Sequence, residues 1–172
     1  TPWVPWMHGG SQERRRRGGT LNVPGIIGLA KAMELATKEM DDHRKHFLKL
    51  RKKLISGLHE KFGNCFQING DIENVVPHIL NISFMDSSGK GIDGEMLILN
   101  LDVENVCVSN GSACTSGAME PSHVLNGIGL EDEIANSSIR ISLGKQNTLE
   151  EIDYFLEKIG VVVERMMGSV KA

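Results

Sequence analysis

Residues 25–62 read GIIGLAKAMELATKEMDDHRKHFLKLRKKLISGLHEKF. Apolar side chains recur in this stretch at spacings of three, four or seven residues, with charged residues between them. That period is typical of the apolar face of an amphipathic helix. No proline interrupts the pattern, which ends near Gly63. The stretch therefore predicts one long helix, or two nearly continuous ones, that connects and braces two structural units.

The sequence after Gly63 predicts a small sheet and several shorter helices. Alternating or β-branched patterns indicate strands at 65–68, around 78–84, around 106–108 and at 138–143. Helices are expected after Asp93 and near Pro121, and the sequence Thr148-Leu149-Glu150-Glu151 matches a capping box that begins a last helix. This order predicts an α+β fold in which helices pack on a small, mostly antiparallel sheet.

The composition is that of a soluble globular protein rather than a disordered one. Hydrophobic residues make up 40% of the 172 residues and charged residues 24%, and the net charge of -3 is too small to imply a polyanionic partner for the whole molecule. Three cysteines without a CxxC pair favour free thiols in a reducing compartment over disulfides or a metal site. No apolar run approaches the ~18 residues of a membrane span, and no signal peptide is visible.

Residues 8–20 form a glycine-flanked basic loop in which Glu13 to Arg17 are five consecutive charged residues. Loops of this kind bind anions through arginine side chains and backbone N–H groups. A solvated charged loop explains the same pattern. One arginine run without interleaved aromatic residues is a weak nucleic-acid signal, so we expect no nucleic-acid partner.

A lone thiol, Cys114, sits in the segment Asn110-Gly111-Ser112-Ala113-Cys114-Thr115-Ser116-Gly117. Glycines and hydroxyl residues favour a loop that can carry a thiol away from the core. A hairpin built on Asn110-Gly111, with Cys114 as a small semi-buried hydrophobic residue, fits the local composition equally well. The pattern does not decide the role of Arg140 either. It lies between two serines on one face of the strand at 138–143, where an exposed arginine on a solvated sheet face is also expected.

Four ordered motifs resemble the NifS/IscS-like cysteine desulfurases. They are residues 109–116 around Cys114, Glu-Pro-Ser-His-Val-Leu at 120–125, Ser-Ser-Ile-Arg-x-Ser-Leu-Gly at 137–144, and the His-Gly-Gly to Gly-Thr loop at 8–20. The likeness runs from about residue 7 to residue 160. It implies the small C-terminal domain of a fold type I pyridoxal-phosphate enzyme, and we expect residues 1–24 to be a remnant of the large domain and residues 25–172 to be the small domain.

The resemblance also implies an activity and a site. Such enzymes convert L-cysteine to L-alanine and leave the sulfur as a persulfide on an active-site cysteine, which corresponds to Cys114. Arg140 matches the arginine that binds the substrate carboxylate. Thr20 matches the threonine that reaches the phosphate of pyridoxal phosphate in the neighbouring subunit of a homodimer. The implied partners are a sulfur acceptor or an iron–sulfur scaffold protein, with iron–sulfur cluster assembly or tRNA thiolation as the destination of the sulfur.

The chain starts at Thr1 without an initiator methionine, and no Ser/Gly-His-Lys motif supplies the lysine that holds the cofactor. We therefore expect a C-terminal part of a longer chain, inactive alone, from a cytoplasmic enzyme or, in a eukaryote, a mitochondrial one. No metal and no membrane are expected. Two alternatives remain: a selenocysteine lyase, or a non-catalytic thiol or interaction module that uses the arginine-rich loop.

Overall fold

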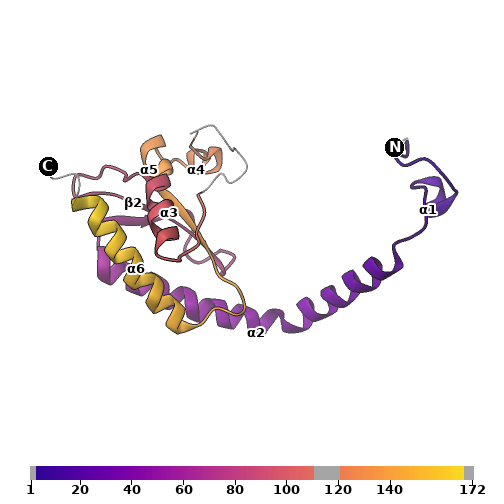
Figure 1. Ribbon diagram of the computed structural model, residues 1–172, viewed down its shortest axis with the longest axis horizontal. Helices are drawn as coiled ribbons and strands as arrows, with labels where there is room; N and C mark the ends of the chain where they lie inside the picture. Colours follow the sequence, from indigo (N-terminus) through magenta and orange to yellow (C-terminus); the bar gives the residue numbers. More distant parts are fainter. Residues whose placement is uncertain (1–2, 111–120, 169–172) are drawn as a thin grey trace. The chain divides into compact units, whose positions relative to one another are not determined.

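The computed structural model describes residues 3–110 and 121–168 (Figure 1). The chain divides into two compact units, Thr1–Asp41 and Asp42–Ala172. The division falls inside the longest helix, α2, which spans Val23–Phe62. The predicted long helix is therefore confirmed as one continuous element. The assignment of residues 1–24 and 25–172 to a large and a small domain stays a prediction.

The two halves of α2 differ in how their apolar side chains are used. In the second unit Leu50, Leu54 and Leu58 are almost completely buried. Ile26, Leu29, Met33 and Met40 continue the same stripe toward the N-terminus, and each is more than half exposed. A helical period identifies the apolar face of α2 but not what covers it, so the sequence alone could not separate these halves.

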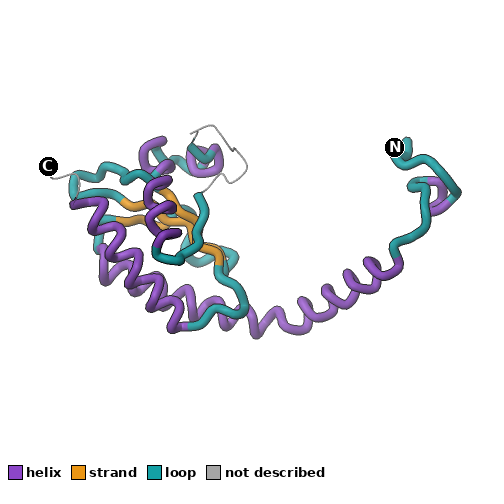
Figure 2. The backbone as a smooth tube through the Cα atoms, viewed as in Figure 1, coloured by secondary structure: helices purple, strands orange, loops and turns teal. Residues whose placement is uncertain are grey.

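Three antiparallel strands form the sheet of the second unit: β1 (Phe66–Ile68), β2 (Ile79–Phe84) and β3 (Ser138–Ser142). Their order is β1-β2-β3, so β2 is central. In Figure 2 the strands, coloured orange, lie among the purple helices of the second unit. The small antiparallel sheet is thus confirmed, and three of the four predicted strands lie where the alternation placed them.

One face of the sheet carries the core. Ile82, Phe84 and Ile139 are fully buried on this face, against the second half of α2, α3 (Gly94–Val103) and α6 (Leu149–Gly168). Lys53 of α2 contacts Asp153 of α6 through an ion pair of 2.5 Å. Further along the same two helices, Gly57 lies against Leu156 and Gly160 lies beside Lys61, so α2 and α6 run side by side in the same direction.

Both helix caps that the sequence predicted are present. The Asp93 carboxylate accepts a hydrogen bond from the Met96 N–H at 3.0 Å, which satisfies one free donor at the start of α3. At α6 the Glu151 N–H donates to Thr148 Oγ1 at 3.2 Å while the Thr148 N–H donates to Glu151 Oε2 at 3.0 Å. This reciprocal pair is the predicted capping box.

Two connections differ from the sequence prediction. The strand predicted around residues 106–108 is wrong, because Asn105 adopts a left-handed φ of 58° and the Val106 N–H bonds back to the Leu101 carbonyl at 2.9 Å. The chain therefore continues as a helix-terminating turn, and only Ser109 forms an isolated bridge. Short helices follow at α4 (His123–Gly127), as predicted, and at α5 (Asp132–Asn136), which the sequence pattern did not reveal.

Gly94 shows how tightly the start of α3 approaches the C-terminal end of α5. A Cβ at this position would overlap the Asn136 carbonyl oxygen, a backbone atom that cannot rotate away. We expect Gly94→Ala to lower the free energy of unfolding by about 1–3 kcal/mol, the usual cost of overpacking. Urea denaturation monitored by circular dichroism measures this loss.

Gly28 of α2 provides the matched control, since a Cβ there meets no atom within 4 Å. Gly28→Ala should leave the free energy of unfolding unchanged or raise it by about 0.5–1 kcal/mol, because alanine is the better helix former. Equal stabilities for the two variants would contradict the close approach at Gly94.

Candidate functional site

Arg140 lies in the middle of β3, on the face of the sheet that turns away from the core. Its neighbours Ile139 and Ile141 are buried on the core side, so the pleat directs Arg140 to the opposite side, together with Ser138 and Ser142. The Arg140 side chain is half-buried. Within the described residues its guanidinium makes no hydrogen bond and no ion pair. A rigid strand therefore holds a cation that has no anionic partner in this part of the chain.

The residue that precedes the thiol segment is bonded directly to Arg140. The Arg140 N–H donates to the Ser109 carbonyl at 2.5 Å, and the Ser109 N–H donates back to the Arg140 carbonyl at 3.2 Å. This isolated antiparallel bridge adds one more residue beside β3. Cys114 itself belongs to residues 111–120, which lie outside the described residues, so its role stays a prediction.

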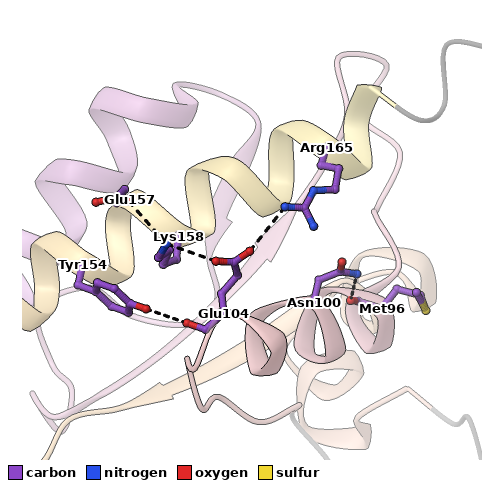
Figure 3. Close-up of polar contacts among 7 residues, drawn as sticks. All are labelled: Met96, Asn100, Glu104, Tyr154, Glu157, Lys158 and Arg165. Carbon is purple, nitrogen blue, oxygen red and sulfur yellow. Dashed lines mark hydrogen bonds and ion pairs between the residues drawn. The ribbon is translucent and has the colours of Figure 1, made fainter.

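The chain that leads from α3 to Ser109 is anchored on α6 by a polar cluster around Glu104 (Figure 3). The Glu104 carboxylate pairs with Lys158 at 3.3 Å and with Arg165 at 3.6 Å. The Tyr154 hydroxyl donates to the Glu104 carbonyl at 2.9 Å. All three partners come from α6, so they hold the C-terminal end of α3 where the chain turns toward the thiol segment.

Electrostatics explains why this cluster needs two cations. A carboxylate at the C-terminal end of a helix faces the negative end of the helix dipole, which disfavours it. Lys158 and Arg165 offset that repulsion. In return, the hydrogen bond to the Glu104 carboxylate raises the pKa of Lys158 above its usual value.

Thr20 belongs to the first unit, on the basic loop that follows α1 (Gln12–Arg15). Its side chain is exposed, and its hydroxyl makes no hydrogen bond within the described residues. Next to it, Arg17 Nη1 donates to the Thr20 carbonyl at 3.4 Å. Gly18 and Gly19 precede Thr20. A Cβ at Gly18 would lie 2.8 Å from the backbone of Gly9, so only glycine allows the two ends of the loop to meet.

The basic loop has an unusual backbone. Glu13, Arg14 and Arg15 have φ values of 49°, 56° and 66°, in the left-handed region that costs a non-glycine residue roughly 1–2 kcal/mol. A cavity of about 280 Å³ lies beside them, and Arg15 contributes to its lining. Arg14, Arg16 and Arg17 are all exposed. The loop thus displays several guanidinium groups to solvent.

Two histidines of α2 make ordinary structural contacts. His46 contacts the Asn147 carbonyl at 3.0 Å, and the ring of His59 packs edge-on against Phe66. Across residues 3–110 and 121–168, no group of three or more His, Cys, Asp or Glu side chains is arranged to hold a metal ion. Cys107 is exposed, and Cys65 is half-buried.

One neighbour of Arg140 was not identified from the sequence. Asn81 of β2 lies directly opposite Arg140 in the antiparallel pair, so both side chains project from the same face of the sheet. The sequence contains one signal of this position, a polar residue between Leu80 and Ile82 in a strand whose only other polar residue is Ser83. The pairing register that places it beside Arg140 is a tertiary property.

Comparison with known proteins agrees with the resemblance seen in the motifs. The model of the family described as Aminotransferase class-V matches residues 7–155. Among curated proteins, the chain is 44% identical over 162 residues to a cysteine desulfurase IscS from Methanosarcina thermophila, which covers 94% of this chain and 38% of that protein. It is 45% identical over 160 residues to the protein of the same name from Vibrio vulnificus, covering 93% of this chain and 37% of that protein.

Solved structures give a matching result for the fold. A structure titled NifS-like protein superimposes with a TM-score of 0.77 at 41% identity, covering 96% of this chain and 40% of the other. A NifS-like protein from Rickettsia africae gives a TM-score of 0.76 at 30% identity, covering 94% and 40%. The chain thus spans less than two fifths of the length of the curated relatives that it matches. Among the helices described, none combines the length and the apolar composition that a membrane crossing requires.

Proposed function

Since the chain belongs to the class-V aminotransferase family, we propose that the protein acts as a cysteine desulfurase, which converts L-cysteine to L-alanine and carries the sulfur as a persulfide on Cys114. The observation that carries this proposal is Arg140, a half-buried guanidinium on a rigid strand with no anion to bind among the described residues. Support also comes from relatives at 44–45% identity that are named cysteine desulfurase.

Arg140 binds the carboxylate of the substrate. The planar guanidinium presents its N–H groups as a fork that matches the two oxygens of a carboxylate, and a strand fixes its direction better than a loop. This contact orients the amino acid so that its sulfur reaches the thiol of the segment that starts after Ser109. The reciprocal hydrogen bonds between Ser109 and Arg140 hold the residue before that segment next to the strand that binds the carboxylate.

Cys114 acts as the nucleophile. Its thiolate attacks the substrate sulfur, an S–S bond forms, and the bond between that sulfur and the substrate Cβ breaks. The electron pair of the broken bond goes to Cβ, which takes up a proton and becomes the methyl group of L-alanine. The second sulfur stays on Cys114 until an acceptor thiolate attacks it.

Pyridoxal phosphate, when bound, supplies the electron sink that weakens the bond between Cβ and sulfur. The described residues fit its phosphate group at one place. Thr20 offers an exposed hydroxyl after two glycines, and Arg17 adds a guanidinium nearby. Hydroxyl, backbone N–H and arginine groups are the donors that phosphate prefers. Thr20 then serves the cofactor of a neighbouring subunit, which makes the active enzyme a homodimer.

A protein acceptor takes the sulfur, either an iron–sulfur scaffold or a carrier for tRNA thiolation. The exposed arginines 14, 16 and 17 suit the docking of an acidic partner. A reducing compartment such as the cytoplasm keeps Cys114 in the thiol form that the reaction needs.

The proposal is tested with the protein expressed from its complete reading frame and supplied with pyridoxal phosphate. Incubation with L-cysteine should release L-alanine in equal amount to the sulfur transferred, and mass spectrometry of digested protein should show a gain of one sulfur atom on the peptide that contains Cys114. Absence of alanine release would refute the proposal. L-selenocysteine, assayed in parallel, distinguishes a selenocysteine lyase by a higher kcat/KM for the selenium substrate.

A further inference from the structure

The face of the sheet that turns away from the core carries a continuous row of polar residues across all its strands. Asn69, just after β1, donates its backbone N–H to the Asn81 carbonyl at 2.9 Å. Asn81 pairs with Arg140 in β2 and β3, and Arg140 pairs with Ser109. The row therefore runs Asn69, Asn81, Arg140, Ser109 from one edge to the other.

A chain of hydrogen bonds determines which way the amide groups of this row point. The Ile134 carbonyl can only accept, so the Ser83 hydroxyl, 2.8 Å away, must donate to it. Ser83 Oγ is then free to accept from Asn69 Nδ2 at 2.9 Å. The opposite end of Asn69 agrees with this orientation, because Asn69 Oδ1 accepts from Gln67 Nε2 at 3.0 Å.

The same logic carries over to Asn81. Asn69 Nδ2 is a donor, so the atom of Asn81 that lies 2.6 Å from it must be the acceptor Oδ1. The amide nitrogen Nδ2 of Asn81 is left with two N–H groups and no hydrogen-bond partner among the described residues. The network thus fixes a donor, rather than an acceptor, as the unused end of Asn81.

This unused donor lies next to the Arg140 guanidinium. Directly opposite residues of an antiparallel pair have Cβ atoms about 4.5–5.5 Å apart, close enough for both side chains to reach one small ligand. Neither group has an acceptor to offer, since guanidinium only donates and Asn81 Oδ1 is already used. A surface that presents only donors and one positive charge is suited to a carboxylate.

We propose that Asn81 is a substrate-binding residue that donates a hydrogen bond from Nδ2 to the carboxylate held by Arg140, and that Asn69 and Ser83 set its orientation. This inference rests on the proposed function, which assigns the carboxylate to L-cysteine. It adds a second contact and predicts that selectivity for a free α-carboxylate depends on β2 as well as on β3.

The test uses the holoenzyme from the complete reading frame and three variants. Asn81→Ala removes the donor and should raise the KM for L-cysteine about 10- to 100-fold, the range for a lost hydrogen bond to a charged group, with a smaller change in kcat. Asn81→Asp is nearly isosteric and keeps an acceptor for Asn69, but it places a carboxylate against the substrate carboxylate. It should weaken binding more than alanine does.

Asn69→Ala removes the orienting bond and keeps the donor, so its effect should be smaller than that of Asn81→Ala. Asn100→Ala provides a matched control, because the Asn100 side chain donates to the Met96 carbonyl within α3 and to no other group among residues 3–110 and 121–168. Its kinetic constants should equal those of the unmodified enzyme.

A binding measurement separates a substrate contact from a structural role. Calorimetric titration with L-alanine, which has the carboxylate but no sulfur, should show affinity about 10-fold lower or more for Asn81→Ala and Asn81→Asp. The affinity for L-alaninamide, which lacks the carboxylate, should be the same in all variants. A merely structural defect would lower both affinities equally and would overturn the inference.

The two proposals fail in different ways. If the unmodified enzyme releases no alanine from cysteine, the proposed function fails. If it does, and Asn81→Asp binds L-alanine as tightly as the unmodified enzyme, then the role of Asn81 alone is refuted.

Discussion

Replacing Cys114 by alanine should reduce sulfur transfer from L-cysteine to the background rate, a loss of at least about 10³-fold. On the proposed function, the Cys114 thiolate both attacks the substrate sulfur and carries it, so removal of this nucleophile removes the pathway. Alanine production by the purified holoenzyme and sulfur delivered to an acceptor thiol are the quantities to measure.

The other two cysteines provide the controls. Cys107 is exposed and stands only seven residues before Cys114 in the sequence, and Cys65 is half-buried. Cys107→Ala and Cys65→Ala should keep full activity. Retained activity in Cys114→Ala would disprove the assignment of the nucleophile. Partner binding that survives the loss of activity in that variant would exclude a non-catalytic thiol module.

Replacing Arg140 by alanine should lower kcat/KM for L-cysteine by about 10² to 10⁴-fold. A bidentate guanidinium–carboxylate contact comprises two hydrogen bonds to a charged group, each of which contributes roughly 1.5–3 kcal/mol. Most of the loss should appear in KM, because the carboxylate is bound in both the ground state and the transition state. Steady-state kinetics over a wide range of cysteine concentrations resolves the two constants.

Two arginine variants sharpen this result. Arg140→Lys keeps the charge but loses the fork, so it should recover only part of the lost kcat/KM. Arg165 lies on α6, which packs on the core face of the sheet, whereas Arg140 lies on the other face. Arg165→Ala removes an arginine that pairs with Glu104 at 3.6 Å and should leave the KM for cysteine unchanged. A KM for Arg140→Ala equal to that of the unmodified enzyme would rule out the carboxylate contact.

Local patterns were sufficient to predict most of the fold. The helical period of α2, the alternation in β3 and the capping box at Thr148 each depend on interactions between residues a few positions apart, and each is confirmed. The strand predicted around residues 106–108 is wrong because its local pattern was misleading. Two valines favour a strand, but the turn at Asn105 and the bond from Val106 to Leu101 override that local preference.

The candidate site divides in the same way. Arg140 was named as a site residue because it matches a family motif; the alternating strand alone fits an exposed arginine equally well, and its role stays a prediction. Asn81 carries an equally simple signal, but its importance comes from standing opposite Arg140, and strand register over such a separation is decided by the packing of the whole sheet. The exposure of the apolar stripe on the first half of α2 could not be predicted either, because helical periodicity identifies an apolar face but not whether another element covers it.

On the proposed function, the bridge between Ser109 and Arg140 also limits how far the sulfur carried by Cys114 can travel. Cys114 follows Ser109 by five residues, and a fully extended chain advances at most about 3.6 Å per residue, so the Cα of Cys114 stays within about 18 Å of the Cα of Ser109. The acceptor therefore has to bring its own thiol within reach of Cys114, inside the region around Ser109 that this length allows. The size and shape of acceptable partners are therefore constrained by the length of the chain after an anchored residue as well as by the surface that they contact.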